Sequence, residues 1–287
     1  MITLTLLHDR HLSGVFGFDR EITSHCYQGT SQFKRALMQP IKDDVKDALW
    51  ASAALLGAIQ MATFEARTPD EAWPLKRPDE ADLDWLKMSE GKKAVFRIAS
   101  PMRPESRFCR ISNGHGGAPD YRPLIEKRLC GREELVGLTR DFSDLFGLGP
   151  EESAGEGENP YYEPGMTLAR LLHVQCDGDN VLEFMGFMMH LSAEFKRLLA
   201  GKDARALLMF AFWYAKLWRG QWWLNRRGLM EGQAICLYLE RFCGDDARLL
   251  RLLEGPKREF GLEAKADDGA GAGSRSCSSA ATVLCVV

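Results

Sequence analysis

One stretch near the end of the chain, residues 222–246, constrains the fold most because it contains every part of a helix signature. Asn225 is a residue type that caps helix N-termini, and Gly244 is the type that most often ends them. Between them, apolar residues recur at i, i+3, i+4 and i+7: Ile235, Tyr238, Leu239 and Phe242. Similar helical periodicity runs through much of the chain, and no segment has a convincing strand pattern. The sequence therefore predicts an all-α protein, an irregular multi-helix bundle.

Prolines and glycines divide this chain of 287 residues into segments. We expect an irregular lead-in (1–20), an N-terminal helical part (21–146), an acidic linker rich in Gly and Pro (147–164), a C-terminal helical part (165–256) and a disordered tail (257–287). In the C-terminal part the patterns predict helices over 166–174, 181–200, 203–218 and 247–253. Gly255 and Pro256 are expected to end the last of them.

The stretch 222–246 also resembles the last helices of the fungal zinc-cluster transcription factors, most closely the branch similar to sterol uptake control proteins. Residues 47–57, 71–76 and 85–95 point to the same family, and the resemblance covers about 22–256. Its signature residues are Trp50, Trp73, Trp222, Trp223, Gln233 and Tyr238. The resemblance implies the helical regulatory domain of such a factor, acting in the nucleus on transcription by RNA polymerase II.

The family's DNA-binding zinc cluster is missing from this chain. That cluster needs six cysteines in two arms with Cys-x2-Cys spacing, and the eight cysteines here never show it. Only Cys236 and Cys243 have a matching x6 gap, and no third partner lies nearby. We therefore expect no cofactor in this chain. The sequence leaves open whether it is a truncated gene product or a natural form without the cluster.

Charge and hydropathy limit the partners of the chain. A net charge of −3 offers no basic field for nucleic acid, so direct DNA binding is not expected. The most apolar run, 206–215, is too short to span a bilayer, and no secretion signal opens the chain. Apart from the nucleus that the resemblance implies, the cytosol is the alternative location.

A set of methionine and aromatic side chains is the candidate ligand pocket: Met185, Met188, Met189, Phe212 and Trp213. Such side chains can line an adaptable apolar cavity, and the resemblance implies a sterol-like ligand. The competing interpretation is that they form ordinary core.

Other polar residues predict no chemistry. His190 and Glu194 stand four apart in the predicted helix 181–200, where an intrahelical hydrogen bond is expected rather than a metal site. No catalytic motif occurs, so an enzyme is not expected. Arg226 and Arg227 stand oddly in the first turn of the signature helix, and pairing with Glu231 or with a partner surface both stay open.

The main alternative function is a helical interaction or dimerisation scaffold without a ligand. It would bind co-regulator proteins or a second copy of the chain.

Overall fold

The structure is a computed structural model that describes residues 1–15, 19–109, 139–149 and 159–262, and every regular element in these ranges is a helix. The predicted all-α class is confirmed for them. The N-terminal group comprises α1 (Ile2–Ser13), α2 (Arg20–Leu37), α3 (Asp43–Ala62), the 3-10 helix η1 (Pro69–Glu71) and α4 (Asp84–Ala99). The C-terminal group comprises α7 (Arg140–Phe146), α8 (Tyr162–Leu171), α9 (Val181–Gly186), the 3-10 helix η4 (Phe187–His190), α10 (Ala193–Ala200), α11 (Ala204–Leu217), α12 (Trp222–Phe242) and α13 (Ala247–Phe260).

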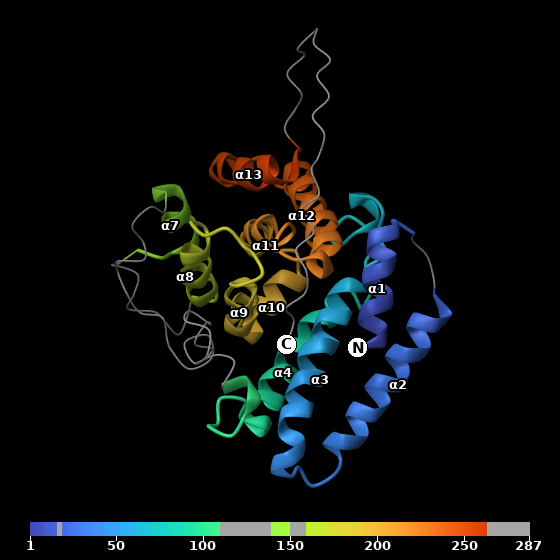
Figure 1. Cartoon of the computed structure of the whole chain (residues 1–287). Coiled ribbons are helices and arrows are strands. Elements are labelled where there is room, and N and C mark those ends of the chain that lie inside the picture. The colour runs from blue at the N-terminus through green and yellow to red at the C-terminus, as the bar shows by residue number, and fades with distance from the viewer. Residues whose placement is uncertain (16–18, 110–138, 150–158, 263–287) are drawn as a thin grey trace.

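The two groups lie side by side, and α12 joins them (Figure 1). Helix α12 packs on α11 and α13 within its own group and on α3 and α1 of the other group. Helix α2 lies at the outer edge, with α1 and α3 as its main neighbours. None of the described helices combines the length and the apolar composition that crossing a membrane requires.

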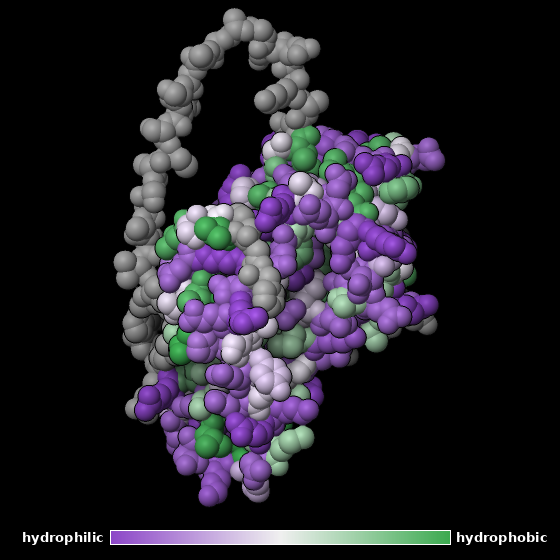
Figure 2. All heavy atoms as spheres, turned by 90° about the vertical axis from the view of Figure 1, so that its right-hand side faces the viewer, coloured by the Kyte–Doolittle hydropathy of each residue, from purple (hydrophilic) through white to green (hydrophobic). Residues whose placement is uncertain are grey.

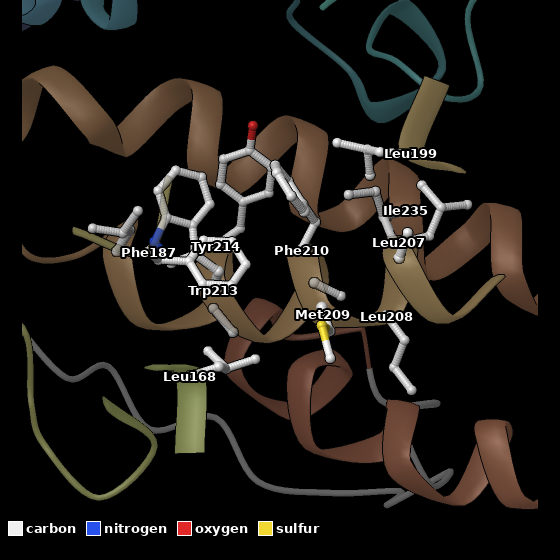
Figure 3. Packing of buried hydrophobic residues seen from close by; sticks show 14 of the residues in the cluster. Leu168, Phe187, Leu199, Leu207, Leu208, Met209, Phe210, Trp213, Tyr214 and Ile235 are labelled. Atoms are coloured by element: carbon white, nitrogen blue, oxygen red, sulfur yellow. The ribbon is translucent and has the colours of Figure 1, made fainter. Parts of the chain in front are cut away.

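The main hydrophobic core surrounds α11, which is buried along most of its length. Figure 3 shows its side chains interleaved with those of Leu168, Phe187, Leu199 and Ile235. Trp85, from the start of α4, stacks on Trp213 with ring centroids 6.2 Å apart. The N-terminal group has only two small clusters of its own, one around Leu7, Ile22 and Ile59 and one around Ala53, Val95 and Ala99.

Side-chain caps explain several helix starts. The Asp203 carboxylate accepts hydrogen bonds from the backbone N–H groups of Arg205 and Ala206 at 3.0 Å each, at the start of α11. Asp246 caps α13 in the same way, and Asp19 caps α2. Each carboxylate satisfies N–H groups that have no partner within the helix.

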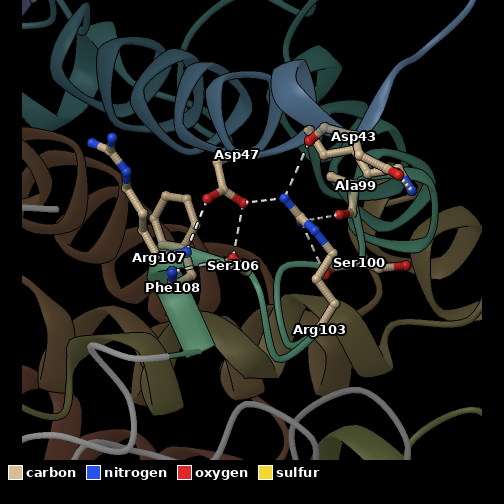
Figure 4. Close-up of polar contacts among 9 residues, drawn as sticks. Asp43, Asp47, Ala99, Ser100, Arg103, Ser106, Arg107 and Phe108 are labelled. Carbon is tan, nitrogen blue, oxygen red and sulfur yellow. Dashed lines mark hydrogen bonds and ion pairs between the residues drawn. The ribbon is translucent and has the colours of Figure 1, made fainter.

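A polar clamp holds the segment after α4 against α3 (Figure 4). The Asp47 carboxylate accepts hydrogen bonds from the Arg103 guanidinium at 2.7 Å, the Ser106 hydroxyl at 2.8 Å and the backbone N–H of Arg107 at 2.9 Å. Burial by itself would raise the pKa of Asp47, but these hydrogen bonds outweigh it and hold the pKa below its ordinary value.

The expected irregular lead-in over 1–20 is wrong, because residues 2–13 form α1. Leu7 is buried with Ile22 and Ile59, so the helix is stabilised by contacts with α2 and α3. Gly14, at φ 65°, ends it. Its hydrophobic pattern alone is weak, which explains why the sequence did not predict it.

Helix ends in the C-terminal group also differ from expectation. Helix α12 begins at Trp222 rather than after Asn225, whose side-chain amide instead donates to the Trp218 carbonyl at 2.9 Å. Helix α13 continues through the buried Pro256 to Phe260 and ends at Gly261, with φ 70°, so part of the expected disordered tail is helical. The burial of Phe260 against Gly232 compensates for the loss of the backbone hydrogen bond that Pro256 cannot donate.

The predicted continuous helix 181–200 is divided into α9, η4 and α10. Ser192 lies between the last two and caps α10, accepting from the backbone N–H of Phe195 at 3.0 Å. The linker predicted over 147–164 is helical from Tyr162, where α8 accommodates Pro164 in its first turn. Residues 110–138 of the expected N-terminal helical part, residues 150–158 of the expected linker and the tail from 263 lie outside the described residues.

Candidate functional site

Four of the five predicted ligand-pocket residues join one hydrophobic cluster, and all five belong to α9, η4 and α11. Met188 and Trp213 are buried, whereas Met185 and Phe212 are half-buried and pack against the cluster from its edge. Met189 is half-buried and stands apart, with its backbone carbonyl accepting a hydrogen bond from Lys93.

Trp213 is the centre of this set, and protein groups surround it. Its ring lies 5.4 Å from that of Phe187 and 5.5 Å from that of Phe210, measured between centroids. Its indole N–H donates to the Phe184 carbonyl at 2.8 Å. Trp213 is therefore a fully satisfied core residue, and a ligand there would have to displace neighbouring side chains.

Buried polar residues lie next to this set, beginning with Tyr214, whose ring centroid is 5.0 Å from that of Trp213. The Tyr214 hydroxyl donates a hydrogen bond to Glu231, and the Arg227 guanidinium donates to the other oxygen of that carboxylate at 2.9 Å. Glu231 and Arg227 are among the few buried charged residues of the described chain, with 2% and 6% exposure. Of the two pairings expected for Arg227, the one with Glu231 is confirmed.

Burial dominates the electrostatics of this triad. It raises the pKa of the Glu231 carboxyl, although Arg227 opposes the shift. Burial and then the negative charge of Glu231 raise the pKa of the Tyr214 hydroxyl, so the tyrosine keeps its proton and donates it in the hydrogen bond.

Arg227 also extends the triad to the N-terminal group. Its guanidinium carbon lies 4.6 Å from the ring centroid of Phe64 and 5.2 Å from that of Trp85. A guanidinium nitrogen lies 3.5 Å from the Gln60 carbonyl at the end of α3. The triad therefore ties α12 to α3 and to the connection before α4. No residue of the triad lines either of the two surface cavities described below.

A polar surface pocket of about 470 Å³ lies between α7, α10 and the start of α8. Tyr161 and Asp203 face each other in it, with the phenol donating to the carboxylate at 2.7 Å, and the Arg205 guanidinium lies 4.3 Å from the tyrosine ring. Burial and the hydrogen bond to Asp203 raise the pKa of Tyr161 to about 12. These groups satisfy one another, and Asp203 is already the cap of α11. Among the described residues, no group of three or more His, Cys, Asp or Glu side chains is arranged to hold a metal.

The family-signature residues are not brought together in one place. Trp50 packs edge-on against Phe96 at 5.2 Å, and Trp73 is buried in the main core. Trp222 lies 4.9 Å from the ring of His8, whereas Trp223 packs against the main cluster. The Gln233 amide donates to the Phe260 carbonyl at 3.1 Å, and Tyr238 lies beside Phe242. Their neighbours differ from one residue to the next, and the contact between Tyr238 and Phe242 lies within α12 itself.

The pair His190 and Glu194 is separated by the break before α10. Glu194 instead pairs with Arg197 at 2.5 Å on the exposed face of α10. His190 belongs to η4 and Glu194 to α10, so the two residues do not share the continuous helix for which their hydrogen bond was predicted.

Sequence reasoning missed the exposed side of the N-terminal group. Helix α2 is 18 residues long, and Ile22 is its one buried residue. Most of the large apolar side chains that the described residues expose also belong to this part of the chain: Met1, Ile2, Leu12, Val15, Tyr27, Leu37, Met38 and Val45. Figure 2 faces this side, where apolar groups are scattered among polar ones.

A second, apolar cavity of about 340 Å³ opens beside α2, lined by Ile22, Thr23, Cys26, Tyr27, Thr30 and Thr63. None of the predicted ligand-pocket residues lines either of the two cavities described. The spacing of apolar and small residues along α2 is the sequence signal that could have indicated this cavity.

Comparisons with known proteins identify no relative: no family model, curated protein or solved structure matches this chain.

Proposed function

We propose that this chain is a regulatory domain that acts through protein contacts and controls transcription, as its resemblance to the fungal zinc-cluster factors implies. The observation that carries the contact-based role is the N-terminal group, where α2 and its neighbours leave apolar side chains exposed beside an apolar cavity. The cavity supports this role more than the exposed side chains do, because single apolar side chains are ordinary on protein surfaces whereas an apolar hollow can receive a partner's side chain. The role is binding rather than catalysis, it requires no cofactor in this chain, and its location is the nucleus.

A reporter assay tests the transcriptional part. The full chain, fused to an unrelated DNA-binding domain, should change transcription of the reporter severalfold relative to that DNA-binding domain alone. An unchanged reporter would remove the support for a role in transcription. The chain by itself should give no mobility shift with DNA at physiological salt, because its net charge is −3.

A sterol-like effector is the second candidate. The specific observation in its favour is that Met185, Met188, Phe212 and Trp213 belong to one cluster that reaches from the surface to the centre of the core. A ligand would act by stabilising one arrangement of this cluster over another.

The ligand hypothesis has a direct test. A sterol that enters the cluster should raise the melting temperature and change the tryptophan fluorescence, and Met188→Ala should alter the response. If a sterol panel changes neither property, this second candidate is excluded while the contact-based role is untouched.

A further inference from the structure

Two histidines of α1 lie against the first residue of α12. Between ring centroids, His8 is 4.9 Å from Trp222 and His11 is 5.8 Å from it. Trp222 in turn packs against the small apolar cluster that contains Leu7. The two imidazoles and the indole therefore form a contact between α1 and α12, next to the cluster that holds α1 on α2 and α3.

The start of α12 disfavours positive charge on these imidazoles. Trp222 opens the helix, where free backbone N–H groups make the positive end, and the first turn has no acidic residue. Arg226 follows one turn later, and its guanidinium donates to the Ala66 carbonyl at 2.9 Å. His11 lies in the last turn of α1, whose negative end offsets part of this repulsion.

The other charged groups on the elements around α1 balance one another. They are Asp9 and Arg10 on α1, Asp19, Arg20 and Glu21 at the start of α2, Glu65 and Arg67 after α3, and Arg226 on α12. The Arg10 guanidinium lies 3.9 Å from the Glu65 carboxylate, and the His25 imidazole lies 3.9 Å from the Glu21 carboxylate. Helix α3 has no charged residue after Asp47. These described elements therefore offer no excess of negative charge to stabilise two protonated histidines.

The preference of His11 for its neutral form follows from this setting. Burial lowers the pKa of the His11 imidazole below its ordinary value, and a charge on His8 lowers it further. An indole attracts a neighbouring cation, but the attraction to Trp222 does not reverse this direction. The contribution of His11 to stability is thus complete above the unfolded pKa of about 6.5 and is lost as the pH falls through the folded pKa.

We propose that His8, His11 and Trp222 form a proton-sensitive latch, which holds α1 on α12 while the imidazoles are neutral and releases it when they take up protons. Release would uncover Ile22 of α2 and Ile59 of α3, which pack against α1. Ile22 also lines the apolar cavity beside α2, so the latch controls how much apolar surface is accessible there. It is independent of the proposed role in transcription, because purified protein alone tests it.

Hydrogen exchange followed by mass spectrometry tests the latch. The amides of residues 2–13 should lose protection by at least about twofold between about pH 7.5 and about pH 5.5, after correction for the chemical exchange rate. The amides of α11 are the internal reference and should keep their protection. Equal protection of α1 at both pH values would overturn the proposal, and so would an equal loss in α11, which would indicate general unfolding.

Substitution separates the two histidines from other titrating groups. The double variant His8→Gln and His11→Gln stays neutral at these positions, so the difference between the two pH values should disappear, even if α1 is less protected at both. His25→Gln is the matched control, since His25 pairs with Glu21 on its own helix, and it should leave the difference unchanged. A pH dependence that persists in the double variant would contradict the latch.

Nuclear magnetic resonance measures the titration in the wild-type chain, where no variant has to fold. The imidazole signals of His11 should titrate below the ordinary pKa of about 6.5. The indole N–H signal of Trp222 should shift over the same pH range, because the protonated rings leave it. A His11 that titrates at or above the ordinary value, or a Trp222 signal that does not follow it, would refute the proposal.

Discussion

Helices α11 and α2 differ in composition, and the structure uses them in opposite ways: α11 contains the most apolar run of the chain, 206–215, whereas α2 is mostly polar. Helix α11, 14 residues long, is buried along most of its length, whereas α2, 18 residues long, buries Ile22 alone. The C-terminal group therefore holds most of the buried apolar area and, with it, most of the stabilisation. The N-terminal group is attached to it chiefly through α12 and the Arg227 contacts, and it keeps surface available for partners.

The largest expected effect comes from removing the centre of the C-terminal core. Trp213→Ala should lower the free energy of unfolding by about 3–5 kcal/mol, because it leaves a cavity that the rigid neighbours cannot fill. Chemical denaturation followed by circular dichroism measures this. Trp222→Ala is the matched control on the N-terminal side, where the ring is half-buried against His8 and His11, and it should cost clearly less. Equal losses would contradict the comparison of the two groups.

The buried triad predicts the next largest loss. Glu231→Ala should destabilise the fold by about 3 kcal/mol, because Arg227 and Tyr214 would lose their acceptor while staying buried. Glu194→Ala removes an ion pair of similar length on the surface of α10 and should cost less than about 1 kcal/mol. Denaturant midpoints of both variants give the comparison. If Glu231→Ala and Glu194→Ala lowered the free energy of unfolding equally, the triad would not be an important connection between the two groups.

The same substitution, glycine to alanine, should have opposite effects on stability in the two groups. Gly232→Ala places a Cβ atom 2.2 Å from the Phe260 ring and should destabilise by about 1–3 kcal/mol. Gly57→Ala lies in α3 with nothing within 4 Å of the new Cβ atom. It should stabilise by about 0.5–1 kcal/mol through higher helix propensity. The melting temperatures of the two variants should shift in opposite directions. Two shifts of the same sign would contradict the expected difference in the space around Gly232 and Gly57.

The Asp47 clamp predicts a small loss of stability that depends on pH. Asp47→Asn should cost about 1–2 kcal/mol at pH 7, because the hydrogen bonds to Arg103, Ser106 and Arg107 lose their charge. The pKa of Asp47 is lowered in the folded state, so its contribution is complete above the unfolded value of about 4 and is lost as the pH falls through the folded pKa. The difference between wild type and variant should therefore shrink below about pH 4 in urea titrations. A constant difference from pH 7 to pH 3 would contradict this account.

Strong periodicity was readable from the residues, whereas helices that depend on neighbours were not, and the N-cap predicted at Asn225 lies inside α12. The starts of α11 and α13, after Asp203 and Asp246, follow directly from capping chemistry. Helix α1 was missed because its few apolar side chains are meaningful only once Ile22 and Ile59 lie beside Leu7. Pro256 was expected to stop a helix that tertiary contacts of Phe260 prolong.

In the candidate site, too, local spacing predicted some contacts and tertiary packing decided the others. The i, i+4 spacing allowed the pairing of Arg227 with Glu231, but nothing local indicated that Tyr214 would complete it, because α11 and α12 meet only in the folded chain. The methionine and aromatic residues were found as a group, and whether they would surround a space or fill it depends on their packing.

The sequence by itself determined that this protein is built from helices, because the spacing of apolar residues and the capping residues act over a few positions. Only the tertiary structure decided which helices pack together, as with α12, which joins the two groups by packing on α11, α13 and α3. That choice depends on contacts between residues far apart in the chain, and those contacts form only when the whole core is assembled.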